Sequence, residues 1–398
     1  MVRDACATPQ PIRRFLPSRY HRPQRSTAGV GGGGAAGPRA FCARMSLKRR
    51  DFLRQLTGVP LVTGALALGQ LGCSRPVRRL QNGLEDRLHL YTWSDYVAPE
   101  TIPRFTRETG VRVVHDTYES SEEMLARLLM GGVAYDVVVP PTYGVQAMRA
   151  TGLLQPWDGA RIATRNQIAP TFRGLPFDPE GNFALPYLWG LTGIAYRADK
   201  VTAPSSWASF LDPALNGRAT MLDDMRDAIG AMLRLRGASI NATDTPALTQ
   251  ARVDALAAKQ VLRGYKSAAV KSDLLAGDVW LAQLWNGDTR QAATEDPRIR
   301  FVLPAEGSTI WLDSMVLLER ARHPAAAHAF AAYILRPDVG AELAQATGYG
   351  TPNVGALQRL ADPVPLPTAD ELARLEYQAD LGRATERWDR IWTEIKAG

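Results

Sequence analysis

Apolar and polar residues alternate with two different periods near the start of the regularly patterned part of the chain. The run Leu88-His89-Leu90-Tyr91 alternates with a period of two, which predicts a strand. Residues 99–109 follow a helical period and end before Gly110, a residue type that favours a helix C-terminus. Residues 111–114 then predict a second strand.

The same order of elements repeats in the next segment. Ser120 followed by Glu123 has the spacing of a capping box at the start of a helix. We expect this helix to bury four apolar side chains, namely Met124, Leu125, Leu128 and Leu129. Residues 136–140 predict a short buried strand. This alternation of strand and helix implies an α/β layer with a largely parallel sheet.

A second α/β stretch covers residues 189–311. It contains a helix that we expect to begin at Thr245-Pro246 and to end at Gly264, and a strand at 279–285. Neither an internal repeat nor a low-complexity linker separates the two stretches. We therefore expect ordered strands to cross between two lobes, near 186–196 and again near 309–313, which favours a hinged cleft.

The charge of the chain changes sign along its length. The 398 residues are 45% apolar and 22% charged, an ordinary globular composition for about two domains. Residues 1–79 hold 15 Lys and Arg against 2 Asp and Glu, whereas 32 basic and 38 acidic residues follow from Leu80 onward. The formal charge of +7 therefore comes from the leading segment, and the acidic body favours a cationic partner over nucleic acid.

The leading segment is interpreted as a targeting signal. Residues 1–44 are rich in Arg, Pro and Gly and are read as disordered or as upstream of a true start at Met45. Residues 45–73 contain Arg49-Arg50-Asp51-Phe52-Leu53-Arg54, which resembles a twin-arginine export signal. A short membrane anchor is the alternative, but its 16-residue apolar stretch is below the roughly 20 residues that span a bilayer.

Cys73 closes this signal and is a candidate lipidation site. Such sites usually carry Leu three residues earlier, where this chain has Gln70, so lipidation stays open. The other two cysteines, Cys6 and Cys42, also precede the body, which therefore has neither a disulfide nor a thiol nucleophile. Five scattered His residues give no metal-ligand spacing, and we expect neither a metal nor a cofactor.

Aromatic residues pair with carboxylates at several expected element ends. The pairs occur in Trp93-Ser94-Asp95-Tyr96, Trp285-Asn286-Gly287-Asp288 and Trp311-Leu312-Asp313, and a cluster of acids occupies 223–227. Aromatic rings cover the methylenes of an organic cation and attract its ammonium groups, while carboxylates accept its hydrogen bonds. Each aromatic taken alone is more typical of core packing, and the acids are also typical of a helix start.

The order of several segments resembles a known family. The segments are Tyr91–Pro99, Tyr118–Ser120, Asp136–Tyr143, Trp285–Gly287, Trp311–Ser314, Leu335–Val339 and Gly348–Asn353. Together, over about 88–398, they resemble the periplasmic spermidine/putrescine-binding proteins of bacterial ABC transporters. The resemblance implies a type II periplasmic-binding-protein fold, with two α/β lobes around a ligand cleft joined by hinge crossovers. The lobes would be 84–189 plus 312–357, and 190–311 plus 358–398.

The resemblance also implies a set of ligand contacts. The matching positions are Trp93, Ser94, Tyr96, Tyr143, Asp224, Asp227, Trp285, Trp311, Asp313, Tyr349 and Gln378. Asp224, Asp227 and Asp313 would hold amino groups, the Trp and Tyr rings would enclose the methylene chain, and Tyr143 and Gln378 would hydrogen-bond at a ligand end. We read Asp223 as structural and Asp95 as a helix cap.

This sequence departs from the family pattern at two positions. Pro141 stands where many members have serine, which removes a hydroxyl and a backbone N–H. Asp227 stands where glutamate is common, so the carboxylate is one methylene closer to the backbone. We expect these departures to affect which polyamine is preferred, whereas the three carboxylates and the aromatic wall remain.

The resemblance implies an extracytoplasmic receptor that binds spermidine or putrescine and delivers it to the permease subunits of an ABC transporter. We expect a periplasmic monomer, tied to the membrane only by its export signal or a lipid anchor, and not an enzyme. The alternatives are a receptor for another organic cation or small solute, a polyamine sensor, and an exported enzyme on the same fold. The absence of Cys after residue 73 argues against the enzyme.

Overall fold

A single mixed sheet organises the part of the chain that the structure describes. The computed structural model describes residues 77–131, 134–267, 269–365 and 367–398. The strands in these residues are β1 (Arg87–Trp93), β2 (Arg112–Tyr118), β3 (Val137–Val138), β4 (Leu154–Gln155), β5 (Ala184–Arg197), β6 (Ala219–Met221), β7 (Leu262–Tyr265), β8 (Leu281–Trp285), β9 (Ile299–Val302), β10 (Ser308–Leu318) and β11 (Leu375–Glu376). Their order is β2-β1-β3-β10-β5-β8-β6-β7, with β4 and β11 beside β10 and β9 beside β5.

The expectation of a largely parallel sheet holds only at the two ends of this order. β1 pairs in parallel with β2 and β3, and β6 pairs in parallel with β7 and β8. The two long central strands break the pattern, because β10 runs antiparallel to β3 and β5, and β5 runs antiparallel to β8 and β9. The local strand–helix alternation that predicted a parallel sheet contains no information about these later strands.

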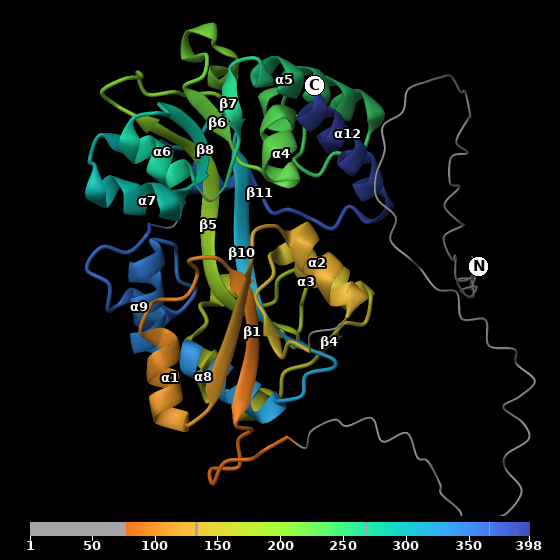
Figure 1. The fold of residues 1–398 in the computed structure, drawn as a ribbon, viewed down its shortest axis with the longest axis vertical. Helices are drawn as coiled ribbons and strands as arrows, with labels where there is room; N and C mark the ends of the chain where they lie inside the picture. The colour runs from red at the N-terminus through yellow and green to blue at the C-terminus, as the bar shows by residue number, and fades with distance from the viewer. Residues whose placement is uncertain (1–76, 132–133, 268, 366) are drawn as a thin grey trace, which may run out of the picture. The chain divides into compact units, whose positions relative to one another are not determined.

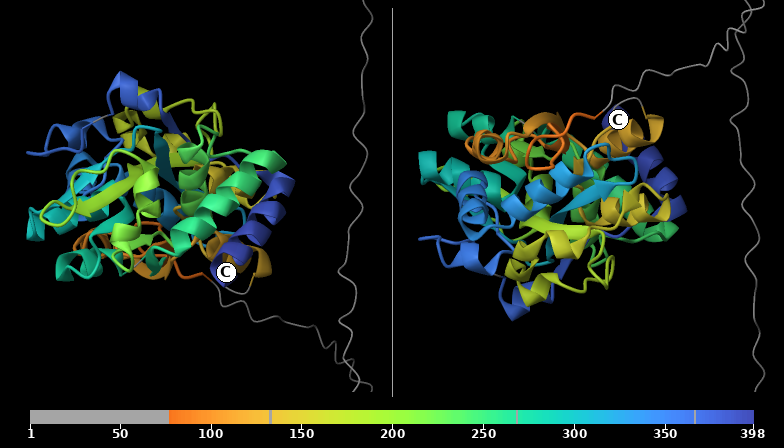
Figure 2. Two further views of the ribbon diagram at one scale, coloured as in Figure 1. Left: turned by 90° about the horizontal axis from the view of Figure 1, so that it is seen from above. Right: turned by 90° about the horizontal axis from the view of Figure 1, so that it is seen from below.

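The helices in the described residues are α1 (Thr101–Thr109), α2 (Ser121–Met130), α3 (Thr142–Ala150), α4 (Met225–Leu235), α5 (Thr245–Lys259), α6 (Val270–Ala276), α7 (Asn286–Glu295), α8 (Pro324–Ile334), α9 (Pro337–Thr347), α10 (Val354–Leu357), α11 (Ala369–Leu372) and α12 (Thr385–Ala397). Three of them were predicted from the sequence, namely α1, α2 and α5. Gly110 ends α1 in the left-handed conformation, as expected. Figure 2 shows helices on both sides of the strands.

Two predictions about α2 need correction. Ser120 caps the helix through the Glu123 N–H, but the Glu123 carboxylate accepts from the Glu119 N–H, so only half of the capping box forms. Leu129 is 62% exposed rather than buried. It lies five residues after the buried Met124, a rotation of about 140° at 3.6 residues per turn, so it faces away from the core.

The expected helix at 245 also differs from the structure at both ends. Asp244, and not Thr245, is the cap, because its side chain accepts from the Ala247 N–H. The helix ends at Lys259, five residues before Gly264, which lies inside β7. The intervening Val261 is buried and leads into this strand, so the chain leaves the helical path earlier than the glycine signal indicates.

Two long strands, β5 and β10, connect separate apolar cores. One core contains residues 88–189 and 310–349 together with Leu375, while two others contain residues from Ile194 to Val302 and the buried side of α12. Figure 1 shows β5 and β10 running between the helices α8 and α9 at one end and α4 to α7 at the other. The predicted crossings near 186–196 and 309–313 thus fall on ordered strands.

The segment 45–73 that we interpret as an export signal, including Cys73, lies outside the described residues, so this interpretation stays a prediction. Among the helices that the structure does describe, none has both the length and the apolar character needed to cross a bilayer.

Candidate functional site

A pocket opens where β1, α3 and β10 meet α4, β8 and α7. The structure places all eleven predicted contact residues on its wall. The lining residues are Trp93, Ser94, Asp95, Tyr96, Glu119, Ser121, Pro141, Tyr143, Asp224, Asp227, Ser267, Lys271, Leu284, Trp285, Asp288, Gln291, Trp311, Asp313, Tyr349 and Gln378. Their binding role stays a prediction, but segments as distant as β1 and the residues after β11 meet here.

One end of the pocket is formed by two carboxyls at the start of α4. The Asp224 side chain caps this helix by accepting from the Asp227 N–H at 2.9 Å. Asp227 is buried, and burial together with the nearby Asp224 raises its pKa to about 7. Asp224 is therefore both a helix cap and a pocket residue, so the two interpretations of the acidic cluster are compatible. Asp223 is exposed and pairs with Lys396 at 2.5 Å, outside the pocket.

The carboxylate of Asp227 is held in place from three elements. Its Oδ1 accepts from Thr192 Oγ1 at 3.1 Å and from Gln378 Nε2 at 3.4 Å, and its Oδ2 accepts from Trp285 Nε1 at 3.2 Å. Trp285 and Gln378, which we expected to touch the ligand, thus also orient the carboxylate. This fixed geometry reduces the reorganisation needed when a cation arrives.

Asp313 is the second buried carboxyl of the site. It lies in β10 at a register shift between Asp313 and Ser314 in the pairing with β5, an irregularity that re-aims a side chain. Burial raises its pKa to about 7, against the opposing effect of the Tyr96 hydroxyl. Pro141, the departure from the family pattern, forms a bridge with Asp313 and precedes α3.

Aromatic rings form the wall between these carboxyls. The ring centres of Trp93 and Trp285 are 6.4 Å apart, and the Trp311 and Tyr349 rings meet edge to face at 4.9 Å. Tyr349 also lies 5.7 Å from Tyr96. The rings therefore contact one another and form a continuous apolar wall against which an alkyl chain can pack.

Two glycines make room for these rings. A Cβ on Gly190 would collide with the Trp311 ring, and a Cβ on Gly287 would collide with the Tyr349 ring. The neighbouring Asn286 accepts from the Leu191 N–H at 2.9 Å, which ties the start of α7 to β5. Each residue of the Trp285-Asn286-Gly287 segment therefore has a structural role. Trp285 donates to Asp227, Asn286 accepts from Leu191, and Gly287 leaves room for the Tyr349 ring.

Several pocket residues were missed or misread from the sequence. Asp95 does not cap α1. The N-cap residue of this helix is Glu100, whose side chain makes no capping hydrogen bond. Asp95 instead has a left-handed backbone, with a φ of 53°, and lines the pocket. Asp288 was also missed. It lies three residues after Trp285 in one of the aromatic–carboxylate segments, so that pattern could have identified Asp288 as a pocket residue. The other missed lining residues are Glu119, Ser121, Ser267, Lys271, Leu284 and Gln291.

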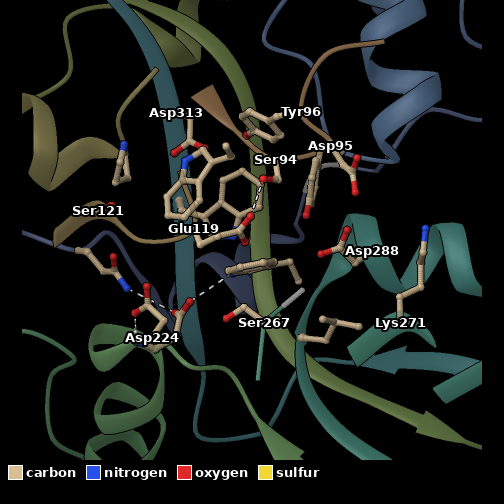
Figure 3. A pocket seen from close by; sticks show the side chains of 18 of the residues that line it. Ser94, Asp95, Tyr96, Glu119, Ser121, Asp224, Ser267, Lys271, Asp288 and Asp313 are labelled. Atoms are coloured by element: carbon tan, nitrogen blue, oxygen red, sulfur yellow. Dashed lines mark hydrogen bonds between the residues drawn. The ribbon is translucent and has the colours of Figure 1, made fainter. Parts of the chain in front are cut away.

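The opposite end of the pocket carries a different set of charges. Figure 3 shows Asp224 on one side and Asp95, Asp288 and Lys271 on the other. Burial raises the pKa of Asp288 to about 6, while the nearby Tyr349 hydroxyl and Lys271 ammonium act against this rise. In the described part of the chain, no three His, Cys, Asp or Glu side chains gather as a metal site.

Comparisons with known proteins agree on the family. The bacterial extracellular solute-binding protein family matches residues 100–371. The spermidine/putrescine-binding periplasmic protein of Escherichia coli is 33% identical over 346 residues, which cover 85% of this chain and 97% of that protein. The putrescine/cadaverine-binding protein of Pseudomonas aeruginosa is 31% identical over 331 residues, or 78% of this chain and 94% of that protein.

Solved structures give the same result. A putative spermidine/putrescine ABC transporter protein from Listeria monocytogenes superimposes with a TM-score of 0.75 at 29% identity, covering 78% of this chain and 99% of that one. The Tp0655 (TpPotD) lipoprotein of Treponema pallidum gives a TM-score of 0.72 at 28% identity, covering 79% and 100%. These similarities establish the periplasmic-binding-protein fold. The chain belongs to the bacterial extracellular solute-binding protein family.

Proposed function

We propose that this chain is an extracytoplasmic receptor that binds a polyamine in the pocket and delivers it to an ABC permease. The observation that carries the proposal is the pair of buried carboxyls, Asp227 and Asp313, beside a wall of indole and phenol rings. A buried carboxyl without a cation is unfavourable, and its raised pKa reflects that cost. An ammonium group that enters the pocket relieves it, while the rings cover the methylenes.

The relatives support the same ligand class. The matched proteins of Escherichia coli and Pseudomonas aeruginosa are named for spermidine, putrescine and cadaverine, which share an alkyl chain with terminal ammonium groups. The eleven residues that carry the resemblance in this sequence gather on one pocket. We therefore assign them as the ligand contacts of this chain.

Binding would couple to a change in the angle between two lobes, 84–189 plus 312–357 and 190–311 plus 358–398. The pocket draws Trp93 and Asp313 from the first and Asp227 and Trp285 from the second. A ligand that touches both lobes stabilises the closed arrangement by its greater affinity for it. The closed form would then be the one that a permease recognises.

The proposal places the receptor in the periplasm as a monomer. Its support is the export-type segment at 45–73 and the periplasmic relatives, one of the structural neighbours being described as a lipoprotein. Acylation at Cys73 would hold the receptor at the membrane surface. Mass spectrometry of the mature protein tests this point, since a lipidated cysteine at the new N-terminus supports the anchor and a free N-terminus elsewhere contradicts it.

Thermal unfolding with different amines tests the ligand class. We expect putrescine to raise the melting temperature of the full-length protein, by mass action on the folded state. Butylamine has the same carbon chain with only one ammonium group, and we expect it to give a much smaller rise. Equal effects of the two amines, or no effect of either, would contradict a site built for a polyamine.

A further inference from the structure

Lys271 places an ammonium group at one end of the acidic pocket. Among the lining residues that the structure describes, it is the only basic one, facing six carboxyl side chains. It lies in the first turn of α6, half-buried, and Figure 3 shows it on the side of the pocket opposite Asp224. A cation in a site for cations is unexpected, because it competes with the ligand for the same carboxylates.

The Lys271 side chain is held by a short chain of hydrogen bonds. Gln291 donates through Nε2 to the carbonyl oxygen of Thr347 at 2.7 Å. This contact fixes the orientation of the amide, so that its Oε1 accepts from Lys271 Nζ at 3.1 Å. Because Gln291 belongs to α7, the ammonium is anchored to the same helix that carries Asp288.

Asp288 is the carboxyl that Lys271 affects. It stands at the same end of the pocket, and the positive charge of Lys271 favours its ionised form. Asp95 also lies at this end and has the opposite effect on Asp288. Asp224 lies across the pocket from this ammonium. Asp227 adjoins Asp224, because its backbone N–H donates to the Asp224 carboxylate.

We propose that Lys271 is a specificity-determining residue that limits the ligand to two ammonium groups. The inference rests on the proposed function and narrows it from polyamines in general to diamines. One ammonium of a diamine pairs with Asp224 and Asp227, and the other pairs with Asp313. The third ammonium of a triamine would extend toward Asp288, where it meets the fixed ammonium of Lys271. Repulsion between two like charges in a partly buried site lowers the affinity for the triamine.

Calorimetric titrations of the full-length protein with putrescine and spermidine test this assignment. The quantity of interest is the ratio of the two dissociation constants, because it cancels general effects on folding. We expect the wild-type protein to prefer putrescine. Lys271→Met removes the charge and keeps most of the side-chain length, and it should shift the ratio toward spermidine by about tenfold or more.

Two further variants show whether the effect comes from the positive charge at position 271. One keeps that charge on a different side chain, and the other changes the net charge of the protein elsewhere. Lys271→Arg keeps the positive charge, so the preference for putrescine should remain. Lys200→Met changes the net charge equally at an exposed position outside the pocket, and its ratio should match that of the wild-type protein.

The outcomes distinguish this inference from the function on which it rests. If the wild-type protein binds neither amine, the proposed function and the role of Lys271 both fail. If the protein binds putrescine but Lys271→Met leaves the ratio unchanged, only the role of Lys271 is overturned. A wild-type protein that binds spermidine as tightly as putrescine also overturns it.

Discussion

The guanidinium carbon of Arg226 lies 5.1 Å from the centre of the Tyr143 ring, so a cation from α4 packs on a pocket residue of α3. The Trp388 ring of α12 is also 5.1 Å from this carbon. The side chain is only 3% exposed and donates to the carbonyl oxygen of Ala379 and to Asn241 Oδ1. Arg226 therefore ties α4 to α3, α12 and the C-terminal segment behind the acidic end of the pocket.

Replacement of Arg226 should destabilise the fold. Arg226→Met removes two buried hydrogen bonds from a charged donor, and we expect the free energy of unfolding to fall by about 2–4 kcal/mol. Urea unfolding followed by circular dichroism measures the change. Arg252→Met is the control, because Arg252 pairs with Glu394 at the surface and such pairs contribute about 0–1 kcal/mol. If the free energy of unfolding fell equally in the two variants, Arg226 would not connect these elements as described.

Loss of the Asp313 charge should weaken binding. Asp313→Asn keeps the size of the side chain but leaves a bound ammonium without its buried partner, at a cost of about 2–5 kcal/mol in binding free energy. Titration with putrescine gives this value. Asp223→Asn is the matched control, since Asp223 is exposed beside Lys396 and does not line the pocket. An unchanged affinity in Asp313→Asn would remove Asp313 from the set of ligand contacts.

Binding should weaken as the pH falls. Burial raises the pKa of Asp313 to about 7, and burial with the nearby Asp224 does the same for Asp227. An ammonium pairs with the ionised carboxyls, so protons must leave when the ligand binds below about pH 7. We expect the affinity for putrescine to drop at least about tenfold between pH 8 and pH 5.5, with proton release detectable by titration in buffers of different ionisation enthalpy. An affinity independent of pH would contradict these shifts.

Asp227 and Asp313 should make the folding stability of the ligand-free protein depend on pH in the opposite direction from the ligand affinity, so that this stability falls as the pH rises. Their pKa in the fold is above the value of about 4 in the unfolded chain, so the folded state binds more protons between these limits. Their contribution to stability is fully present below about pH 4 and is lost as the pH rises through about 7. Putrescine should therefore stabilise the fold more at pH 8 than at pH 5.5. Equal stabilisation at both values would show that these carboxyls do not titrate with binding.

Gly287 should tolerate no side chain. A methyl group there would collide with the Tyr349 ring, and we expect Gly287→Ala to destabilise the fold by about 1–3 kcal/mol and to weaken ligand binding. Gly230→Ala, in the buried face of α4, is the control. A Cβ there has its nearest neighbour at 3.6 Å, so its effect should be neutral or stabilising. Thermal unfolding and titration of both variants check this, and a neutral Gly287→Ala would contradict the close packing.

The resemblance to the polyamine-binding family implied eleven residues of the pocket wall, because these carboxylates and rings occur in short segments whose order along the chain matches that family. Trp93 ends β1, Trp285 ends β8, and Asp313 lies where β10 passes from one half of the sheet to the other. Such positions meet at one edge or switch point of an α/β sheet. The aromatic–carboxylate pattern alone indicated a site for an organic cation, and the match to the family indicated which residues line the pocket.

Other features depend on contacts between distant segments. The sequence around Lys271 does not distinguish it from a lysine on the exposed face of a helix. Its place in the pocket depends on the hydrogen bond to Gln291 of α7. Asp95 has the residue type of a cap, but its left-handed backbone turns it toward the site. The antiparallel pairing of β10 likewise depends on tertiary packing rather than on the pattern within either strand.

The most direct test of the central claim is a calorimetric titration of the full-length protein with putrescine and spermidine, in parallel for the wild type and Asp313→Asn. We predict one binding site per chain for at least one of the two amines, with a dissociation constant of about 1 μM or below, and a large loss of affinity in the variant. The absence of binding to the wild type at millimolar amine, or equal affinity of the two proteins, would contradict the assignment of this pocket as a polyamine site.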